Sequence, residues 1–247
     1  MSWLQFAVVF TAFLQLITSQ FWLNEEFGEA ALDPPVPTPE LLAQPAGYAF
    51  GIWFLIYFAC LGFALYQAWP RLREDVYLNT VRPYVAAGFF LNAFWLFCAT
   101  QGPLWFTPLV ITGLLLAVGF GFLYSLERNE TSQTKYYLTS LPLAVYTGWV
   151  GVAFWLNWAD ILAGYGLSLG IEEPWRSLLV LFGALGLAIF LVRRSFANVA
   201  YTLTVAWALL GILVKNGSNV VGITALAVLV IVGFTFLYVR SLRTSFS

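Results

Sequence analysis

The sequence of 247 residues contains no histidine, only two cysteines and few charged side chains. Charged residues make up 9% of the chain, whereas soluble domains have roughly a quarter. Hydrophobic residues account for 61%, and the mean hydropathy is +0.82. This composition predicts a polytopic membrane protein. The lack of histidine also removes the commonest metal ligand, haem ligand and general base.

The remaining side chains offer little for catalysis or ion coupling. Cys60 and Cys98 lie in separate apolar stretches, so they predict neither a disulfide framework nor a zinc site. No phosphate-binding glycine loop is present, and no charged residue falls at the centre of a predicted span. Proton-coupled carriers and ion channels usually need such intramembrane charges. We therefore expect a binding protein that is not an enzyme and holds no metal.

Eight apolar stretches are long enough to cross a bilayer. Residues 83–126 are uncharged throughout, and Gln101-Gly102-Pro103 divides them into two spans joined by a tight turn. The predicted fold class is all-α, a polytopic transmembrane helical bundle. The eight predicted spans are Trp3–Leu23, Tyr48–Trp69, Pro83–Thr100, Leu104–Ser125, Leu141–Trp158, Ser177–Val192, Phe196–Val214 and Val220–Val239.

Loop charges predict the orientation of these spans. Only Arg176 and Lys215 lie in the odd-numbered loops, after spans 1, 3, 5 and 7. The other nine basic residues follow spans 2, 4, 6 and 8, namely Arg71, Arg73, Arg82, Arg128, Lys135, Arg193, Arg194, Arg240 and Arg243. Positive residues concentrate in cytoplasmic loops, so both termini are predicted to be cytoplasmic.

The fifth span carries polar and aromatic groups on one face. At about 100° per residue, one narrow stripe contains Pro142, Tyr146, Trp149, Ala153 and Asn157. An unpaired amide in hydrocarbon is costly, so this stripe should face protein or a cavity. One interpretation is helix packing, in which Gly148 and Gly151 allow close approach. The other is a ligand cavity.

Two further spans have similar faces. The second presents Trp53, Tyr57, Cys60, Ala64 and Gln67, and the third presents Gly88, Asn92, Trp95 and Ala99. Each of these faces, like that of the fifth span, combines a tryptophan with at least one polar group. Flat aromatic molecules stack well on such rings. Three such stripes favour a ligand cavity over packing alone, whereas the last three spans, with fewer aromatic and amide groups, are predicted to be scaffold.

These stripes resemble the translocator protein family, also called tryptophan-rich sensory proteins (TspO/MBR). The family pattern Tyr-x-x-Trp-Val-x-x-Ala-x-x-Leu-Asn is similar to the stretch from Tyr146 to Asn157, and Leu-Asn-x-x-Trp to the stretch from Leu91 to Trp95. Phe50-Gly51, Trp53 and Tyr57 resemble the family's second helix, and the Pro34-Pro35 loop its first loop. The resemblance covers about residues 1–160. The last three spans have no counterpart in the five-helix fold and resemble the longer branch of tryptophan-rich proteins. No sterol motif follows Asn157.

The resemblance implies a five-helix TspO-like domain at 1–160 and a three-helix extension at 161–247. It implies binding of a porphyrin or another flat lipophilic molecule in a cavity under the first loop, by a sensor, carrier or regulator. No covalent cofactor is expected; the ligand would be a tetrapyrrole such as a porphyrin, haem or a chlorophyll precursor. The residues expected to bind it are Trp53, Tyr57, Asn92, Trp95, Tyr146, Trp149, Ala153 and Asn157.

Two other functions fit the same sequence features. The chain could be a structural subunit or assembly factor of a larger membrane complex, or a transporter of small lipophilic molecules. The expected partners are the lipid bilayer, a lipophilic small molecule and either a second copy of the chain or a larger complex, without nucleic acid. The expected location is a bacterial inner (cytoplasmic) membrane or a thylakoid membrane.

Overall fold

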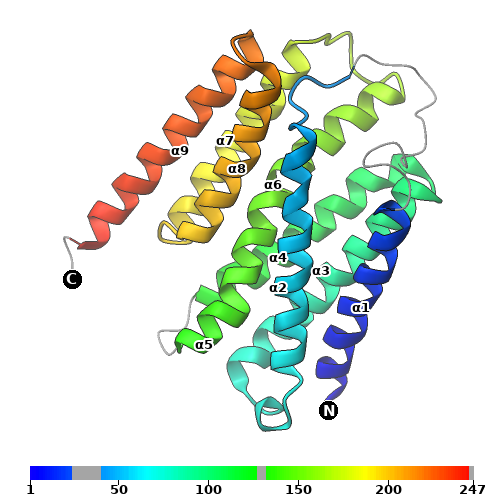
Figure 1. Ribbon diagram of the computed structural model, residues 1–247, viewed down its shortest axis with the longest axis vertical. Helices are drawn as coiled ribbons and strands as arrows, with labels where there is room; N and C mark the ends of the chain where they lie inside the picture. Colours follow the sequence, from blue (N-terminus) through cyan, green and yellow to red (C-terminus); the bar gives the residue numbers. More distant parts are fainter. Residues whose placement is uncertain (24–39, 127–131, 245–247) are drawn as a thin grey trace. The chain divides into compact units, whose positions relative to one another are not determined.

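The computed structural model describes residues 1–23, 40–126 and 132–244. Of the described residues, 84% are helical and none forms a strand, which confirms the all-α prediction (Figure 1). The elements are α1 Trp3–Leu23, η1 Gly47–Gly51, α2 Ile52–Gln67, η2 Pro70–Leu72, α3 Val76–Thr100, η3 Leu104–Phe106, α4 Thr107–Leu126, α5 Gln133–Lys135, η4 Tyr136–Ser140, α6 Leu141–Gly164, α7 Trp175–Arg194, α8 Val199–Asn216 and α9 Val220–Thr244.

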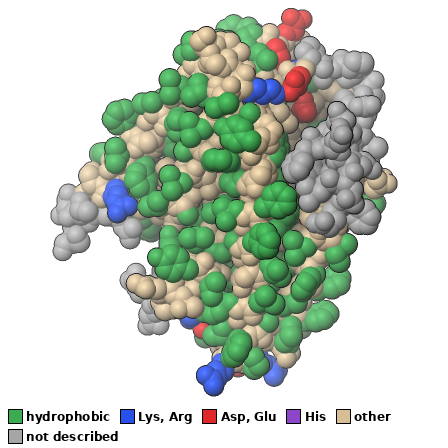
Figure 2. Space-filling view, in the orientation of Figure 1, with side chains coloured by type: hydrophobic (Ala, Val, Ile, Leu, Met, Phe, Trp, Pro, Cys, Tyr) green, Lys and Arg blue, Asp and Glu red, His purple; other side chains and the backbone are tan. Residues whose placement is uncertain are grey.

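The helices have the length and composition of membrane spans. Seven of those in the described residues are long and apolar enough to cross a bilayer, one for each predicted span from the second to the eighth. The first predicted span corresponds to α1, of 21 residues, whose apolar stretch Trp3–Ser19 is shorter than the other seven. Hydrophobic side chains cover much of the face seen in Figure 2. The chain is therefore an integral membrane protein.

Helix α3 begins earlier than the predicted third span. The span was expected to start at Pro83, but the helix starts at Val76, with Pro83 inside it. Asp75 caps this helix, because its side chain accepts the Leu78 N–H at 2.9 Å. Arg82 consequently lies within α3 and is fully buried, whereas the sequence placed it in a loop.

The chain divides into two compact units. Unit 1 comprises residues Met1–Asp33 and Ile52–Thr147, and unit 2 comprises Pro34–Gly51 and Gly148–Ser247. The division falls within α6, between Thr147 and Gly148. The expected boundary between a family domain and an extension near residue 160 stays a prediction.

In unit 1, α3 is the central helix and packs against both α1 and α4. A small residue allows one of these contacts, since a Cβ on Gly88 would lie 2.7 Å from a methyl carbon of Val118. Large side chains such as Phe89 and Leu114 are buried near this crossing. Helix α3 is therefore held on two sides, and its polar residues Arg82, Asn92 and Thr100 are buried.

Arg82 joins α2, α3 and the connection between them. Its guanidinium donates five hydrogen bonds: Nε to Gln67 Oε1 at 2.8 Å, one terminal nitrogen to the carbonyls of Gln67 and Leu72 at 2.9 and 2.7 Å, and the other to Arg73 O and Asn79 Oδ1. All five N–H groups thus have acceptors, which a buried guanidinium requires.

The same network reaches α1 through two glutamines. Gln5 Nε2 donates to Gln67 O at 2.8 Å, and Gln67 Nε2 donates in return to Gln5 O at 3.1 Å. Both side chains are fully buried. The start of α1 is thereby fixed to the end of α2.

An ion pair links two loops at this end of unit 1. Lys135 Nζ lies 2.7 Å from Asp75 Oδ2 and also 5.0 Å from the centre of the Tyr77 ring. The N-terminal end of α1 and the loops after the second and fourth spans therefore share one end of the unit, as the alternation of loop charges predicts. Which side of a membrane this end faces stays a prediction.

This ion pair predicts sensitivity to acid. Burial alone would raise the pKa of the Asp75 carboxyl, but the hydrogen bond from Lys135, the Leu78 N–H and the charge of Lys135 outweigh it, so the pKa lies below its ordinary value. A lowered folded-state pKa contributes stability that is complete above the unfolded pKa of about 3.9 and is lost as pH falls through the folded value.

We expect the acid-induced loss of stability to be smaller for Asp75→Asn than for the wild type below about pH 4. The measurement is thermal unfolding in detergent from pH 7 to pH 3. Glu74→Gln is the matched control, because Glu74 is exposed and, among the described residues, forms an ion pair only with exposed Arg73. Equal acid sensitivity of Asp75→Asn and the wild type would contradict this assignment.

In unit 2, α9 packs against α7 and α8, and glycines allow close contacts of α6 with α7 and α8. A Cβ on Gly148 would lie 2.8 Å from Thr204 Cβ in α8, and one on Gly151 would lie 3.3 Å from Leu187 in α7. The predicted role of these two glycines in helix packing is confirmed.

Candidate ligand-binding site

A cluster of buried polar side chains lies inside unit 1, with Asn92 of α3 near its centre. Asn92 Nδ2 donates to Tyr57 OH of α2 at 3.3 Å and to Gln15 Oε1 of α1 at 3.4 Å. The Tyr146 hydroxyl, near the start of α6, donates to the same Gln15 oxygen at 3.3 Å. Four helices thus each contribute one polar side chain to a single network.

Aromatic rings pack against this cluster. Trp53 stacks on Tyr57, with ring centres 5.4 Å apart, and meets Tyr146 edge to face at 6.0 Å. Phe89 stacks on the other side of Tyr146 at 6.3 Å. Tyr57 and Tyr146 are 8% and 0% exposed, whereas Trp53 is half-buried. Trp53 is therefore the more accessible edge of the aromatic group.

Three polar atoms in or beside this cluster have no hydrogen-bond partner among the described residues. They are Gln15 Nε2, Asn92 Oδ1 and Trp95 Nε1, and all three are buried. Trp95 follows Asn92 by one helical turn on the same face of α3. Unpaired buried polar groups cost roughly 1–3 kcal/mol each, so they need an explanation. A ligand that offers both a donor and an acceptor would satisfy them.

The cluster contains no ionised side chain. Cys60 is buried on α2, on the same helical face as Tyr57. In the described part of the chain, no group of three or more His, Cys, Asp or Glu side chains could hold a metal ion. These uncharged amides, hydroxyls and indoles can orient a neutral or aromatic molecule, and they supply no obvious acid or base.

The structure brings together five of the eight predicted binding residues in unit 1: Trp53, Tyr57, Asn92, Trp95 and Tyr146. The other three, Trp149, Ala153 and Asn157, belong to unit 2. There, Trp149 is 3% exposed and meets the edge of Phe50, with ring centres 5.5 Å apart. Ala153 and Asn157 are half-buried. The predicted lid, which contains Pro34-Pro35, lies outside the described residues.

Comparison with known families gives one match, to the family described as TSPO-like protein, over residues 3–238. That range covers nearly the whole chain. This chain belongs to the TSPO-like protein family. Searches of the curated proteins and of the solved structures gave no match.

The family match extends further than the motifs indicated. The quoted motifs lie within residues 1–160, and the TSPO-like match continues through α7 and α8 and into α9, where the sequence resembled the longer branch of the family. The last three spans are therefore part of what defines this TSPO-like protein. They require a structural or functional explanation within the family.

Gln15 is the cluster residue that the sequence reasoning missed. It accepts hydrogen bonds from both Asn92 and Tyr146 and is fully buried. The available signal was an amide in the middle of an otherwise apolar first span, but that span carries none of the family motifs quoted above. Its partners lie on α3 and α6, far away in sequence.

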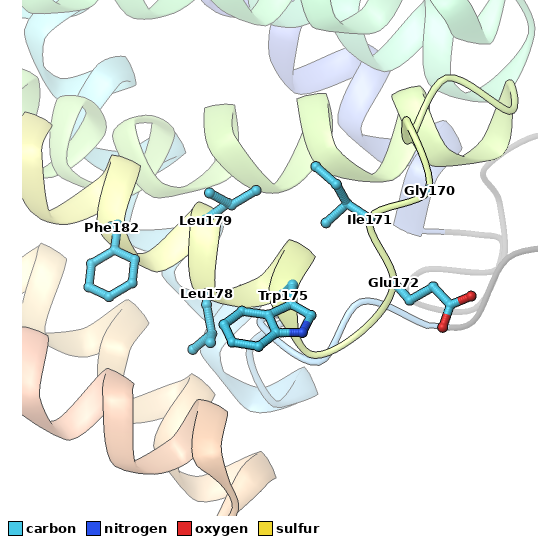
Figure 3. A pocket seen from close by; sticks show the side chains of 7 residues that line it. All are labelled: Gly170, Ile171, Glu172, Trp175, Leu178, Leu179 and Phe182. Carbon is cyan, nitrogen blue, oxygen red and sulfur yellow. The ribbon is translucent and has the colours of Figure 1, made fainter.

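A surface hollow of about 610 Å³ lies beside the start of α7 (Figure 3). Its lining is apolar apart from Glu172, and Trp175, Leu179 and Phe182 are exposed on the helix surface. Exposed apolar side chains on a membrane-spanning helix are expected to contact lipid chains. We therefore do not assign a separate function to this hollow, which is lined by Gly170, Ile171, Glu172, Trp175, Leu178, Leu179 and Phe182.

Proposed function

We propose that this TSPO-like membrane protein binds a flat lipophilic molecule of the tetrapyrrole class, without catalysing a reaction, as a sensor, carrier or regulator. The observation that carries the proposal is the buried cluster around Asn92, with three unpaired polar atoms beside half-buried indoles. The macrocycle would stack on Trp53 and Trp95 and present its polar edge to the cluster.

The chemistry of the cluster favours binding through the ring system. Natural porphyrins carry carboxyl groups at the edge of the ring, and their oxygens can accept hydrogen bonds from Gln15 Nε2 and Trp95 Nε1, which have no partner among the described residues. The sequence contains no histidine, the side chain that most often ligates a haem metal. We therefore expect a metal-free porphyrin to bind about as well as a metallated one.

Trp95→Phe tests the proposal. The change removes an indole N–H that has no partner within the described chain, so folding stability should be unchanged or slightly higher. If that N–H bonds a ligand, affinity should fall about 5- to 10-fold, the equivalent of one hydrogen bond of about 1–1.4 kcal/mol. The measurement is a titration of a metal-free porphyrin, followed by its absorbance, into the detergent-solubilised protein.

Trp105→Phe is the matched control, because Trp105 lies at the start of the fourth span and is 53% exposed. It should leave porphyrin affinity unchanged. Equal affinity of wild type, Trp95→Phe and Trp105→Phe would show that the porphyrin binds elsewhere, and the proposed site would be wrong. No saturable porphyrin binding by the wild type would overturn the proposed function itself.

A further inference from the structure

The segment that leads into α2 is bound to α8 within unit 2. This segment, residues 40–51, is called the anchor segment below. The indole Nε1 of Trp207 donates to Ala49 O at 2.9 Å, and Asn216 Nδ2 donates to Leu42 O at 2.7 Å. In the opposite sense, Ala46 N donates to Gly211 O at 3.1 Å.

Helix α7 provides a fourth attachment. Ser177 Oγ accepts the Ala43 N–H at 2.8 Å and donates to Glu173 Oε2 at 2.7 Å. Glu173 is also paired with Arg176, whose Nε lies 3.2 Å from the other carboxylate oxygen. An exposed ion pair between Lys215 and Glu40 adds little to this attachment.

The surface of α8 fits the anchor segment closely. Tyr48 meets Trp207 edge to face, with ring centres 5.5 Å apart. At Gly211, an added Cβ would lie 2.9 Å from Ala49 Cβ and 3.1 Å from Pro45 Cβ. Only glycine at this position therefore allows the segment to lie against the helix while Ala46 reaches the Gly211 carbonyl.

The anchor segment ends at a residue that contacts Trp149, one of the eight residues predicted from the sequence to bind a ligand. Phe50 lies edge-on to Trp149, a tryptophan of the family motif in α6. The segment then continues directly into α2, which carries Trp53 and Tyr57. The contacts that hold residues 40–51 therefore also hold Phe50 against Trp149.

We infer that α7 and α8 position the anchor segment, so that Phe50 stays against Trp149 and ligand affinity is raised by preorganisation. This gives the last three spans a role beyond filling the membrane, with Trp207, Gly211 and Asn216 as positioning residues. The expected effect on ligand affinity rests on the proposed function, whereas the attachment of the segment does not. A segment held in its binding geometry loses less conformational freedom when a ligand binds.

The test compares two glycine substitutions in neighbouring helices. Gly211→Ala places a methyl group against the anchor segment, whereas Gly186→Ala in α7 meets nothing within 4 Å. Amide hydrogen exchange at Ala43 and Ala46 reports the attachment directly. We expect exchange to become at least about 10-fold faster in Gly211→Ala and to stay unchanged in Gly186→Ala.

Affinity for a metal-free porphyrin should fall about 5-fold or more in Gly211→Ala, mainly through faster dissociation, and stay unchanged in Gly186→Ala. Trp207→Phe keeps the ring beside Tyr48 and removes only the N–H donor, so it should give a smaller change in the same direction. If Gly211→Ala does not fold, Trp207→Phe still tests the inference.

The possible results separate the claim that α7 and α8 hold the anchor segment from the claim that this attachment raises ligand affinity. Unchanged exchange in both Gly211→Ala and Trp207→Phe would overturn the attachment. Faster exchange with unchanged porphyrin affinity would overturn the positioning role. Failure of the wild type to bind porphyrin would overturn the proposed function, while the exchange rates would still decide whether α8 holds the segment.

Discussion

Replacement of Arg82 by alanine should cost about 3–5 kcal/mol of unfolding free energy, from the cavity that a large buried side chain leaves and from acceptors that lose their donor. The guanidinium is fully buried and donates five hydrogen bonds. Without it, the side-chain oxygens of Gln67 and Asn79 lose their donor, and a cavity remains between α2 and α3. The measurement is equilibrium unfolding in mixed micelles, with helicity as the signal.

Arg82→Lys should recover only part of this stability. Lysine keeps the charge, but its ammonium cannot reproduce the planar fork that reaches the carbonyls of Gln67 and Leu72 together. Arg71→Ala is the control, since Arg71 is exposed in the adjoining turn. If Arg82→Ala were as stable as Arg71→Ala, the network would not contribute to folding.

Gly148→Leu should destabilise the protein by about 3 kcal/mol, because the contact between α6 and α8 has no room for a side chain. Even a methyl group at Gly148 would lie 2.8 Å from Thr204 Cβ and 3.1 Å from the Tyr201 carbonyl oxygen. The measurement is again equilibrium unfolding in mixed micelles. Gly62→Leu in α2 is the matched control, since nothing lies within 4 Å of a Cβ there, and its stability should be unchanged or higher.

A second substitution can confirm the cause. In Gly148→Ala, the added methyl group contacts Thr204, so combining it with Thr204→Gly moves the small residue to the opposite helix. We expect the pair to recover about half of the loss, as contacting residues are non-additive. Strictly additive effects of the two substitutions would mean that the clash lies elsewhere.

The long helices of the described residues were predictable because long uncharged runs have few alternatives in a membrane protein. The start of α3 was not predictable by the same rule. The charge of Arg82 predicted a position outside the bilayer. In the structure, Asp75 caps the helix seven residues earlier, and neighbouring carbonyls accept hydrogen bonds from the guanidinium. The bounds of a span therefore depend on local hydrogen bonds that hydropathy does not record.

The binding face was partly predictable for a similar reason. Helical periodicity places Tyr57, Asn92 and Tyr146 on inward faces. In the structure, Asn92 is hydrogen-bonded directly to Tyr57, and Gln15 links Asn92 to Tyr146. Periodicity cannot show which helices are neighbours, so Gln15 was missed. The role of Trp207, in a span predicted to be scaffold, was not predictable either, because its hydrogen bond to Ala49 joins residues far apart in sequence.

The partners of Arg82 also bear on how the protein enters the membrane. All the acceptors of its guanidinium lie between Gln67 and Asn79, at the end of α2, in the connection to α3 and in the first turn of α3. A lone arginine is costly in hydrocarbon, but here its donors can be satisfied before any distant helix is synthesised. We therefore expect the second and third spans to insert together as a preformed hairpin, with α1 joining through Gln5 and the later helices packing against it afterwards.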